Sequence, residues 1–155
     1  MRAMPYASVY VVRPVAGGHE LLLGRRAEGQ YMGGTWQLIS GGIEPDETAW
    51  QAAVREVKEE TGLAVRELYR LTQVEPFYRA DVDAIGIAVM FCAIVDPAAQ
   101  VSINPEHTHL EWVPIDAAAG RLMWPGDIKG LAEMRTHILG DSSIKPHLRV
   151  PIDAA

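Results

Sequence analysis

The chain has 155 residues, 48% of them hydrophobic, and a formal net charge of −6 at pH 7. This length and composition suit a single domain with a substantial core. Binding to a nucleic-acid polymer depends on clustered Lys and Arg, so the acidic charge argues against such a partner. An anionic ligand would then need a metal ion or a local basic patch.

Two absences in the sequence bear on location. No run approaches the roughly 18 consecutive apolar residues of a membrane-spanning helix, and the first residues lack the apolar core of a signal peptide. The single cysteine, Cys92, lies in an apolar run, which indicates a buried small side chain rather than a nucleophile. We therefore expect a soluble, cytoplasmic protein with no membrane partner.

The first part of the chain predicts three strands. Residues 6–14 are rich in β-branched and aromatic side chains and end at a proline, and residues 20–26 form a short apolar run. Residues 35–40 predict a third strand, which is expected to end in a turn at Gly41 and Gly42.

A helix is expected next, over residues 47–61. This segment contains no Gly or Pro, and Gly62 follows it as a predicted stop. Its apolar residues recur at helical spacing and form one stripe, made of Trp50, Ala53, Val54 and Val57.

The second half predicts more strands and one helix. Residues 64–78 indicate a strand with a turn near Pro76, and residues 83–96 a long strand that is apolar on both faces. Such a strand belongs in the middle of a sheet that is covered on both sides. Residues 106–116 predict a further strand, and residues 126–140 a last helix.

These elements predict an α/β fold, an α/β/α sandwich with a mixed β-sheet between helices. We expect one domain over residues 1–140. Residues 141–155 contain two prolines and no periodicity, so they are expected to be an extended tail packed on that domain or extending from it.

An acidic cluster lies at the end of the expected helix. Glu56, Glu59 and Glu60 fall within an arc of roughly 100° beside the apolar stripe. Carboxylates at this spacing repel one another by a few tenths of a kcal/mol per pair, so the segment is either a solvated face or a cation site. Mg²⁺ and Mn²⁺ prefer such oxygen ligands, and the backbone carbonyl of Gly41 could complete the set. Arg55 is expected on the other side of the helix from these three carboxylates.

The spacing of the surrounding residues decides between these two readings. Seven positions match the Nudix box, namely Gly41, Glu47, Arg55, Glu56, Glu59, Glu60 and Gly62. With ordinary residue usage this match arises by chance about once in 10⁸ start positions. The sequence resembles the Nudix hydrolases over nearly its whole length, a family with an α/β/α sandwich that hydrolyses nucleoside diphosphates linked to another moiety.

The resemblance implies roles for the box residues. Glu56, Glu59 and Glu60, with the Gly41 carbonyl, would bind Mg²⁺ or Mn²⁺, while Glu47 and Arg55 would fix the loop and helix. The family places its general base either within the box or on a later loop, where Glu106 matches a common glutamate. Glu106 is therefore a further candidate ligand or base. His107 and His109 beside it are expected to be structural or exposed.

The amino-acid sequence around the box resembles that of the dihydroneopterin triphosphate and dATP pyrophosphohydrolase branch, whose members release a monophosphate and pyrophosphate. Candidate substrate-binding residues supply aromatic surface or phosphate contacts, and these are Trp36, Gln37, Arg25, Arg26 and Tyr78. For Trp36, a place in the core is the favoured alternative.

Two other functions remain open at this point: hydrolysis of ADP-ribose or dinucleoside polyphosphates, and nucleotide binding without catalysis. The complete set of box carboxylates argues against the non-catalytic alternative. The expected partner is a small-molecule nucleoside or pterin phosphate, and the protein would be a monomer or a homodimer.

Overall fold

The computed structural model describes residues 1–154, and its strands form a mixed sheet. Six strands follow the order β3-β2-β1-β6-β5-β8, while β4 pairs with β1 and β7 pairs with β2. Only β1 and β6 run parallel, and the other paired strands are antiparallel. The strands are β1 Arg2–Val15, β2 Gly18–Arg26, β3 Trp36–Gln37, β4 Ile39–Gly42, β5 Val65–Arg79, β6 Ala84–Val95, β7 His107–Pro114 and β8 Arg149–Val150.

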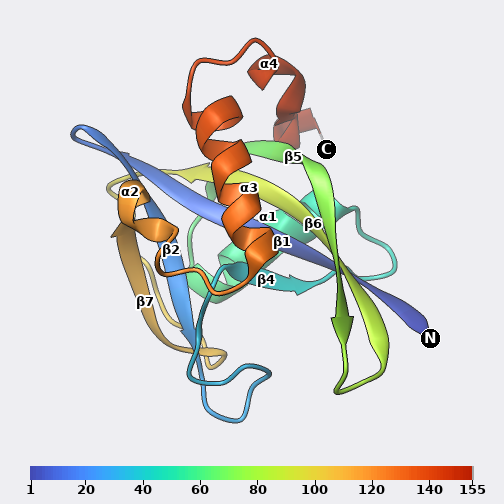
Figure 1. Ribbon diagram of the computed structural model, residues 1–155. Helices are drawn as coiled ribbons and strands as arrows, with labels where there is room; N and C mark the ends of the chain where they lie inside the picture. Colours follow the sequence, from blue (N-terminus) through green and yellow to red (C-terminus); the bar gives the residue numbers. More distant parts are fainter. Residues whose placement is uncertain (155) are drawn as a thin grey trace.

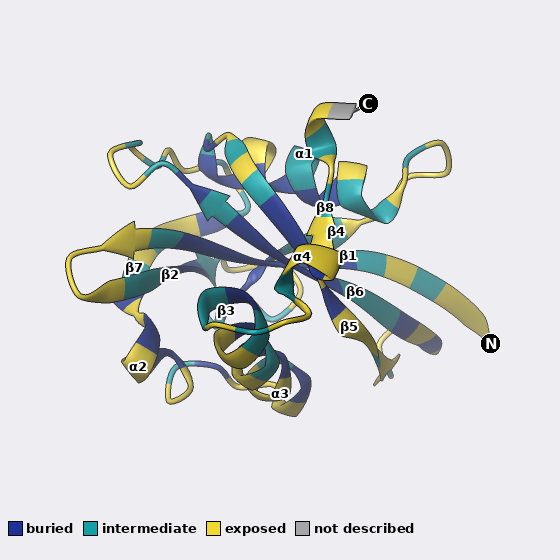
Figure 2. Ribbon diagram, turned by 90° about the horizontal axis from the view of Figure 1, so that it is seen from above, coloured by how far each residue is buried: buried dark blue, intermediate teal, exposed yellow. Residues whose placement is uncertain are grey.

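Helices cover both faces of this sheet, with α1 behind the strands and α3 in front of them in Figure 1. Viewed from above, the strands lie between these two helices (Figure 2). The helices are α1 Ala49–Thr61, α2 Ile115–Ala118, α3 Pro125–Met134 and α4 Lys145–Leu148, with a π-helical turn over Arg135–Leu139 and a 3₁₀ turn over Ile152–Ala154. Two separate apolar cores result, one under α1 and one under α3. The predicted α/β/α sandwich is confirmed.

The strand β6 shows why the sheet is covered by helices on both faces. It lies between β1 and β5, as its two apolar faces predicted. Val89 and Phe91 belong to the core under α1, whereas Met90 and Cys92 belong to the core under α3. The alternation of side chains along one strand therefore builds both cores.

Two predicted turns are wrong, because the chain stays extended at both places. Gly41 and Gly42 belong to β4 and pair with Ala7 and Tyr6 of β1. Pro76 lies within β5 and pairs with Ile87 of β6. β8 covers β5 only at Leu68 and Tyr69, so Pro76 sits where β5 is an edge strand and tolerates a missing N–H.

The C-terminal region is more ordered than an extended tail. The predicted last helix begins one residue earlier, at Pro125, and changes to π-helical geometry at Arg135. The tail then forms α4 and β8, because Leu148 is buried in the core under α3 and the following residues pair with β5. Within residues 1–154, no helix combines the length and apolarity needed to cross a membrane.

Candidate active site

The helix α1 carries most of the acidic side chains, and its two ends are well defined. Thr48 caps its start: the hydroxyl accepts a hydrogen bond from the Gln51 N–H, and the Gln51 side chain accepts one from the Thr48 N–H. Gly62 ends it in the left-handed conformation, with φ 77°, and donates its N–H to the Lys58 carbonyl. The predicted helix and stop are confirmed, except that Glu47 and the capping residue Thr48 precede the helix.

Arg55 connects the loop before α1 to the acidic cluster. Its guanidinium donates to both carboxylate oxygens of Glu47, at 2.5 and 3.0 Å, and to the Gly42 carbonyl at 3.0 Å. It also donates to Glu56 at 2.7 Å and to Glu59 at 3.2 Å. The expectation that Arg55 lies away from the acidic cluster is therefore wrong, because its long side chain spans the gap between Glu47 and the helix carboxylates.

Gly41 makes the closest approach between β4 and α1. A Cβ atom at this position would overlap the carboxylate of Glu56. Glu56 is buried, and this burial raises the pKa of its carboxyl group, an effect that the Arg55 guanidinium opposes. Only glycine at position 41 lets this carboxylate lie against the main chain, beside the carbonyl that the sequence assigns to a metal.

Glu60 is the most deeply buried acidic residue of the site, with 0% relative exposure. Neither of its carboxylate oxygens has a hydrogen-bond partner among the described residues. Burial, together with the nearby carboxylates of Glu106 and Glu56, raises the pKa of Glu60 to about 10, while the charge of Arg26 opposes this rise. A buried acid without a partner is a costly feature, and it marks a position where a ligand would supply the missing contact.

The loop before β7 brings Glu106 to the same place. The Ser102 N–H donates to the Thr61 carbonyl at 2.8 Å, and the Asn104 side chain donates to the Glu59 carbonyl at 3.2 Å. This loop is thus fastened to the last turn of α1. The charge of Glu106 contributes to the raised pKa of both Glu56 and Glu60, so the loop carboxylate faces the helix carboxylates.

We define the carboxylate site as Glu56, Glu59, Glu60 and Glu106. Within residues 1–154, no three His, Cys, Asp or Glu side chains converge into a complete metal-ligand cluster. Two of the site carboxylates, Glu56 and Glu59, are instead bridged by the Arg55 guanidinium. The donor chemistry nevertheless fits a hard divalent cation, since Glu60 offers two unpartnered buried oxygens and the other three side chains of the site are also carboxylates.

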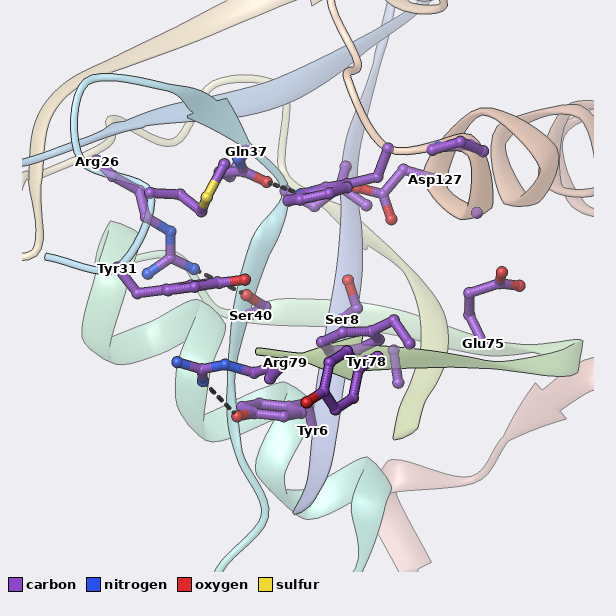
Figure 3. A pocket seen from close by; sticks show the side chains of 17 residues that line it. Tyr6, Ser8, Arg26, Tyr31, Gln37, Ser40, Glu75, Tyr78, Arg79 and Asp127 are labelled. Atoms are coloured by element: carbon purple, nitrogen blue, oxygen red, sulfur yellow. Dashed lines mark hydrogen bonds between the residues drawn. The ribbon is translucent and has the colours of Figure 1, made fainter. Parts of the chain in front are cut away.

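A cavity of about 310 Å³ lies beside the carboxylate site. Residues from the six strands β1 to β6 and the start of α3 line it, as does the loop between β2 and β3. Figure 3 shows Arg26 and Ser40 pointing toward each other, with Arg26 donating to the Ser40 hydroxyl at 3.1 Å. Because Arg26 lines the cavity and its charge also acts on Glu60, it connects the cavity to the carboxylate site.

Aromatic rings and a second arginine form one wall of the cavity. The Arg79 guanidinium lies 3.9 Å from the centre of the Tyr31 ring and donates to the Tyr6 hydroxyl at 2.8 Å (Figure 3). Phe77 packs near Tyr6, with ring centres 5.9 Å apart. Flat apolar rings with positive charge between them suit a base or pterin ring attached to phosphates.

Of the predicted substrate-binding residues, Gln37, Arg26 and Tyr78 line the cavity. Gln37 is buried and accepts a hydrogen bond from the Trp124 indole at 3.0 Å. Trp36 lies outside the cavity lining and packs against the core under α3, with the Arg121 guanidinium 5.1 Å from its ring.

Arg25 is also absent from the cavity lining, and its guanidinium donates to the Thr108 hydroxyl at 3.2 Å. Neighbouring residues on a strand point to opposite faces, which explains why Gln37 and Arg26 reach the cavity and the residues before them do not.

Several cavity residues could not be found from the sequence. Tyr6, Tyr31 and Arg79 come from separate parts of the chain, and no local pattern links them. Trp124 precedes a proline, a residue favoured at the first position of a helix, so the sequence could suggest a helix start there but not a place in the cavity. Its place in the cavity depends on the contact with Gln37.

A family model described as the NUDIX domain matches residues 4–134. The chain belongs to the Nudix hydrolase family. The match covers the strands β1 to β7 and the helices α1 to α3, including the carboxylate site. Both the resemblance and the Nudix-type fold expected from the sequence are confirmed.

Curated relatives are similar to the chain over part of their length. The chain is 38% identical over 113 residues to an octanoyltransferase of Myxococcus xanthus, covering 68% of this chain and 29% of that protein. It is 33% identical over 82 residues to an RNA pyrophosphohydrolase of Bradyrhizobium sp., covering 51% of this chain and 48% of that protein. The chain thus spans less than half the length of either relative.

Solved structures show the same Nudix fold. A Caenorhabditis elegans Ap4A hydrolase, crystallised as a binary complex, superposes with a TM-score of 0.73 at 21% identity. The superposition covers 85% of this chain and 95% of that one. At this identity the likeness supports the fold.

Proposed function

We propose that the protein hydrolyses a nucleoside or pterin triphosphate to the monophosphate and pyrophosphate, with Mg²⁺ or Mn²⁺ as cofactor. One observation carries this proposal: the unpartnered buried Glu60 lies close to an arginine that also lines an aromatic cavity. A cation site next to a cavity for a flat ring is the arrangement that phosphate hydrolysis on such a substrate needs.

The carboxylate site and the Gly41 carbonyl would hold the cation. When bound, a divalent cation neutralises charge on the phosphate oxygens and makes water a stronger nucleophile. Arg55 would then remain with Glu47 and the Gly42 carbonyl, to which it donates three of its hydrogen bonds. These contacts keep β4 and α1 at a fixed separation.

Glu106 is the residue that we propose as proton acceptor. It is only partly buried, and its backbone is held by bonds to Asn104 and Ala27, at 3.0 and 2.9 Å. A carboxylate in contact with solvent can pass a proton on, whereas the fully buried Glu60 has no such path. Glu60 therefore suits a ligand and Glu106 suits a base.

The cavity would hold the rest of the substrate. Tyr31, Phe77 and Tyr78 offer ring faces for stacking, and Arg26 and Arg79 offer positive charge for phosphate oxygens. Gln37 contributes a side-chain amide on the cavity wall. These contacts give a physical reason for a triphosphate with a flat ring, although the protein as a whole is acidic.

A substrate panel tests the proposal. The protein would be incubated with Mg²⁺ and dNTPs, dihydroneopterin triphosphate, ADP-ribose, diadenosine polyphosphates or a 5′-triphosphorylated oligoribonucleotide, and the phosphate products identified. Release of pyrophosphate from a small triphosphate is expected. Preferred turnover of ADP-ribose, dinucleotides or RNA would replace the proposed substrate. Tight nucleotide binding without turnover of any compound would contradict catalysis.

A further inference from the structure

Among the described side chains, four buried nitrogen or oxygen atoms lack a hydrogen-bond partner, and all four belong to Glu60 and His107. The Nε2 atom of His107 lies 3.7 Å from a carboxylate oxygen of Glu60. Both side chains are essentially inaccessible to solvent, with relative side-chain exposures of 0% for His107 and 1% for Glu60. Buried polar atoms in native proteins are nearly always paired, so this adjacent pair requires an explanation.

The fold holds the imidazole in place against Glu60. His107 is the first residue of β7, and its strand partner is Arg26 on β2. The ring lies over Gly24, where an added Cβ atom would come within 2.5 Å of the imidazole Cδ2. Because Gly24 has no side chain, the imidazole can occupy this buried position beside the Glu60 carboxylate.

We propose that His107 is a positioning residue, whose Nε2–H donates a hydrogen bond to Glu60 and fixes the direction in which that carboxylate faces the cation. This role rests on the proposed function, because it takes Glu60 as a metal ligand. An N–H···O hydrogen bond needs about 2.7–3.2 Å, so the two groups must close by about 0.5–1 Å. A rotation of the Glu60 side chain supplies a movement of this size.

The physical reason lies in the ionised carboxylate. A charged Glu60 buried without a donor would be strongly unfavourable, and the neighbouring carboxyl groups of Glu106 and Glu56 disfavour its charge instead of stabilising it. Donors behind a ligating side chain fix its orientation, and their removal typically lowers metal affinity by about 10–100-fold. A ring that only fills space would have no such effect.

Two substitutions separate these roles in the full-length protein. His107→Phe keeps a planar ring but removes the donor, whereas His107→Gln retains an N–H group near the position of Nε2. Binding of Mg²⁺ and Mn²⁺ would be measured by titration calorimetry without substrate. We expect His107→Phe to lose about 10–100-fold in affinity, and His107→Gln to recover most of it. The exposed neighbour His109 provides the matched control, and His109→Phe should bind as the unaltered protein does.

The ring nitrogens give a measurement that needs no variant. Nitrogen-15 NMR of the unaltered protein should show the tautomer with the proton on Nε2 of His107, and its signal should shift when Mg²⁺ is added. Equal affinity in His107→Phe, or a proton on Nδ1 with Mg²⁺ bound, would overturn the positioning role alone. Failure of the unaltered protein to bind either cation would instead overturn the proposed function, and the role of His107 with it.

Discussion

The carboxylate site and the cavity lie next to each other but are built in different ways. Three of the four site carboxylates come from one turn of α1, and Glu106 comes from one loop fastened to that turn. The cavity wall instead combines residues from six strands, a loop and the start of α3. The chemical groups are thus specified locally, whereas the shape that selects a substrate depends on the whole fold.

The largest expected effect concerns the carboxylate site. Glu60→Gln should lower kcat by about 10³-fold, because several kcal/mol of charge stabilisation would be lost. The cation-free protein should remain folded, since the amide has the same shape and avoids the raised pKa of the buried acid. Steady-state kinetics and circular dichroism check both expectations. A variant that retains its kcat would show that Glu60 is no ligand.

A smaller loss of activity is expected from a substitution in β4, the strand next to the carboxylate site. Gly41→Ala should reduce activity by about 10²-fold, because the added methyl group displaces the Glu56 carboxylate. Gly42→Ala is the matched control, since a Cβ atom there would meet nothing within 4 Å. Kinetics of the two variants would be compared with their melting temperatures. Equal activities would mean that the close approach of Glu56 to β4 does not matter for catalysis.

Substitutions at two tryptophans test the difference between a ring at the cavity and a ring in the core. Trp124→Leu should raise KM by about 10-fold with little change in kcat, since loss of an aromatic surface costs a base about 1–3 kcal/mol of stacking. Trp36→Leu should leave KM unchanged and lower stability, because Trp36 packs against the core. Kinetics and urea unfolding of both variants measure these effects. A raised KM in Trp36→Leu would place that ring at the substrate after all.

The smallest effect concerns pH and the cavity wall. Burial, with a contribution from the charge of Glu75, raises the pKa of Asp127 from its ordinary value of 3.8 to about 6. The folded protein therefore binds more protons than the unfolded chain between these values, and the free energy of unfolding falls as pH rises through this window.

Replacing this carboxyl group isolates its contribution. Asp127→Asn should reduce the loss of stability between pH 4 and pH 7 by about 1 kcal/mol, allowing for partial contact with solvent. Urea unfolding of both proteins at the two pH values measures the difference. An unchanged pH dependence would mean that Asp127 ionises as it does in the unfolded chain.

The same contrast explains what could be predicted from the sequence. Period-2 and helical spacing gave the principal strands, the helix α1 and the layered architecture, because these patterns depend on local geometry. The turns expected at Gly42 and Pro76 were wrong, since pairing with β1 and β6 overrode local turn preference. The strand β8 was missed because a two-residue strand has no measurable period.

The candidate site also divides into residues that local sequence could indicate and residues whose place depends on distant contacts. Helical spacing grouped Glu56, Glu59 and Glu60, and the Nudix resemblance gave them a metal-binding role that stays a prediction. The direction of Arg55 depended on where Glu47 and Gly42 lie in space. Arg26 and Gln37 were proposed from their position before the box, and both line the cavity. Arg79 could not be proposed, because its contact with Tyr6 joins residues 73 positions apart.

The two bonds from the loop at Ser102 and Asn104 to the end of α1 have a wider consequence. One joins two backbone atoms and the other joins the Asn104 side chain to a backbone carbonyl, across segments more than 40 residues apart, so the separation of Glu106 from the helix carboxylates is set when the chain folds. The geometry of the carboxylate site is therefore largely preorganised, and ligand binding need not restrict a mobile loop. The conformational entropy of that loop is lost during folding, which leaves more of the binding free energy for the substrate.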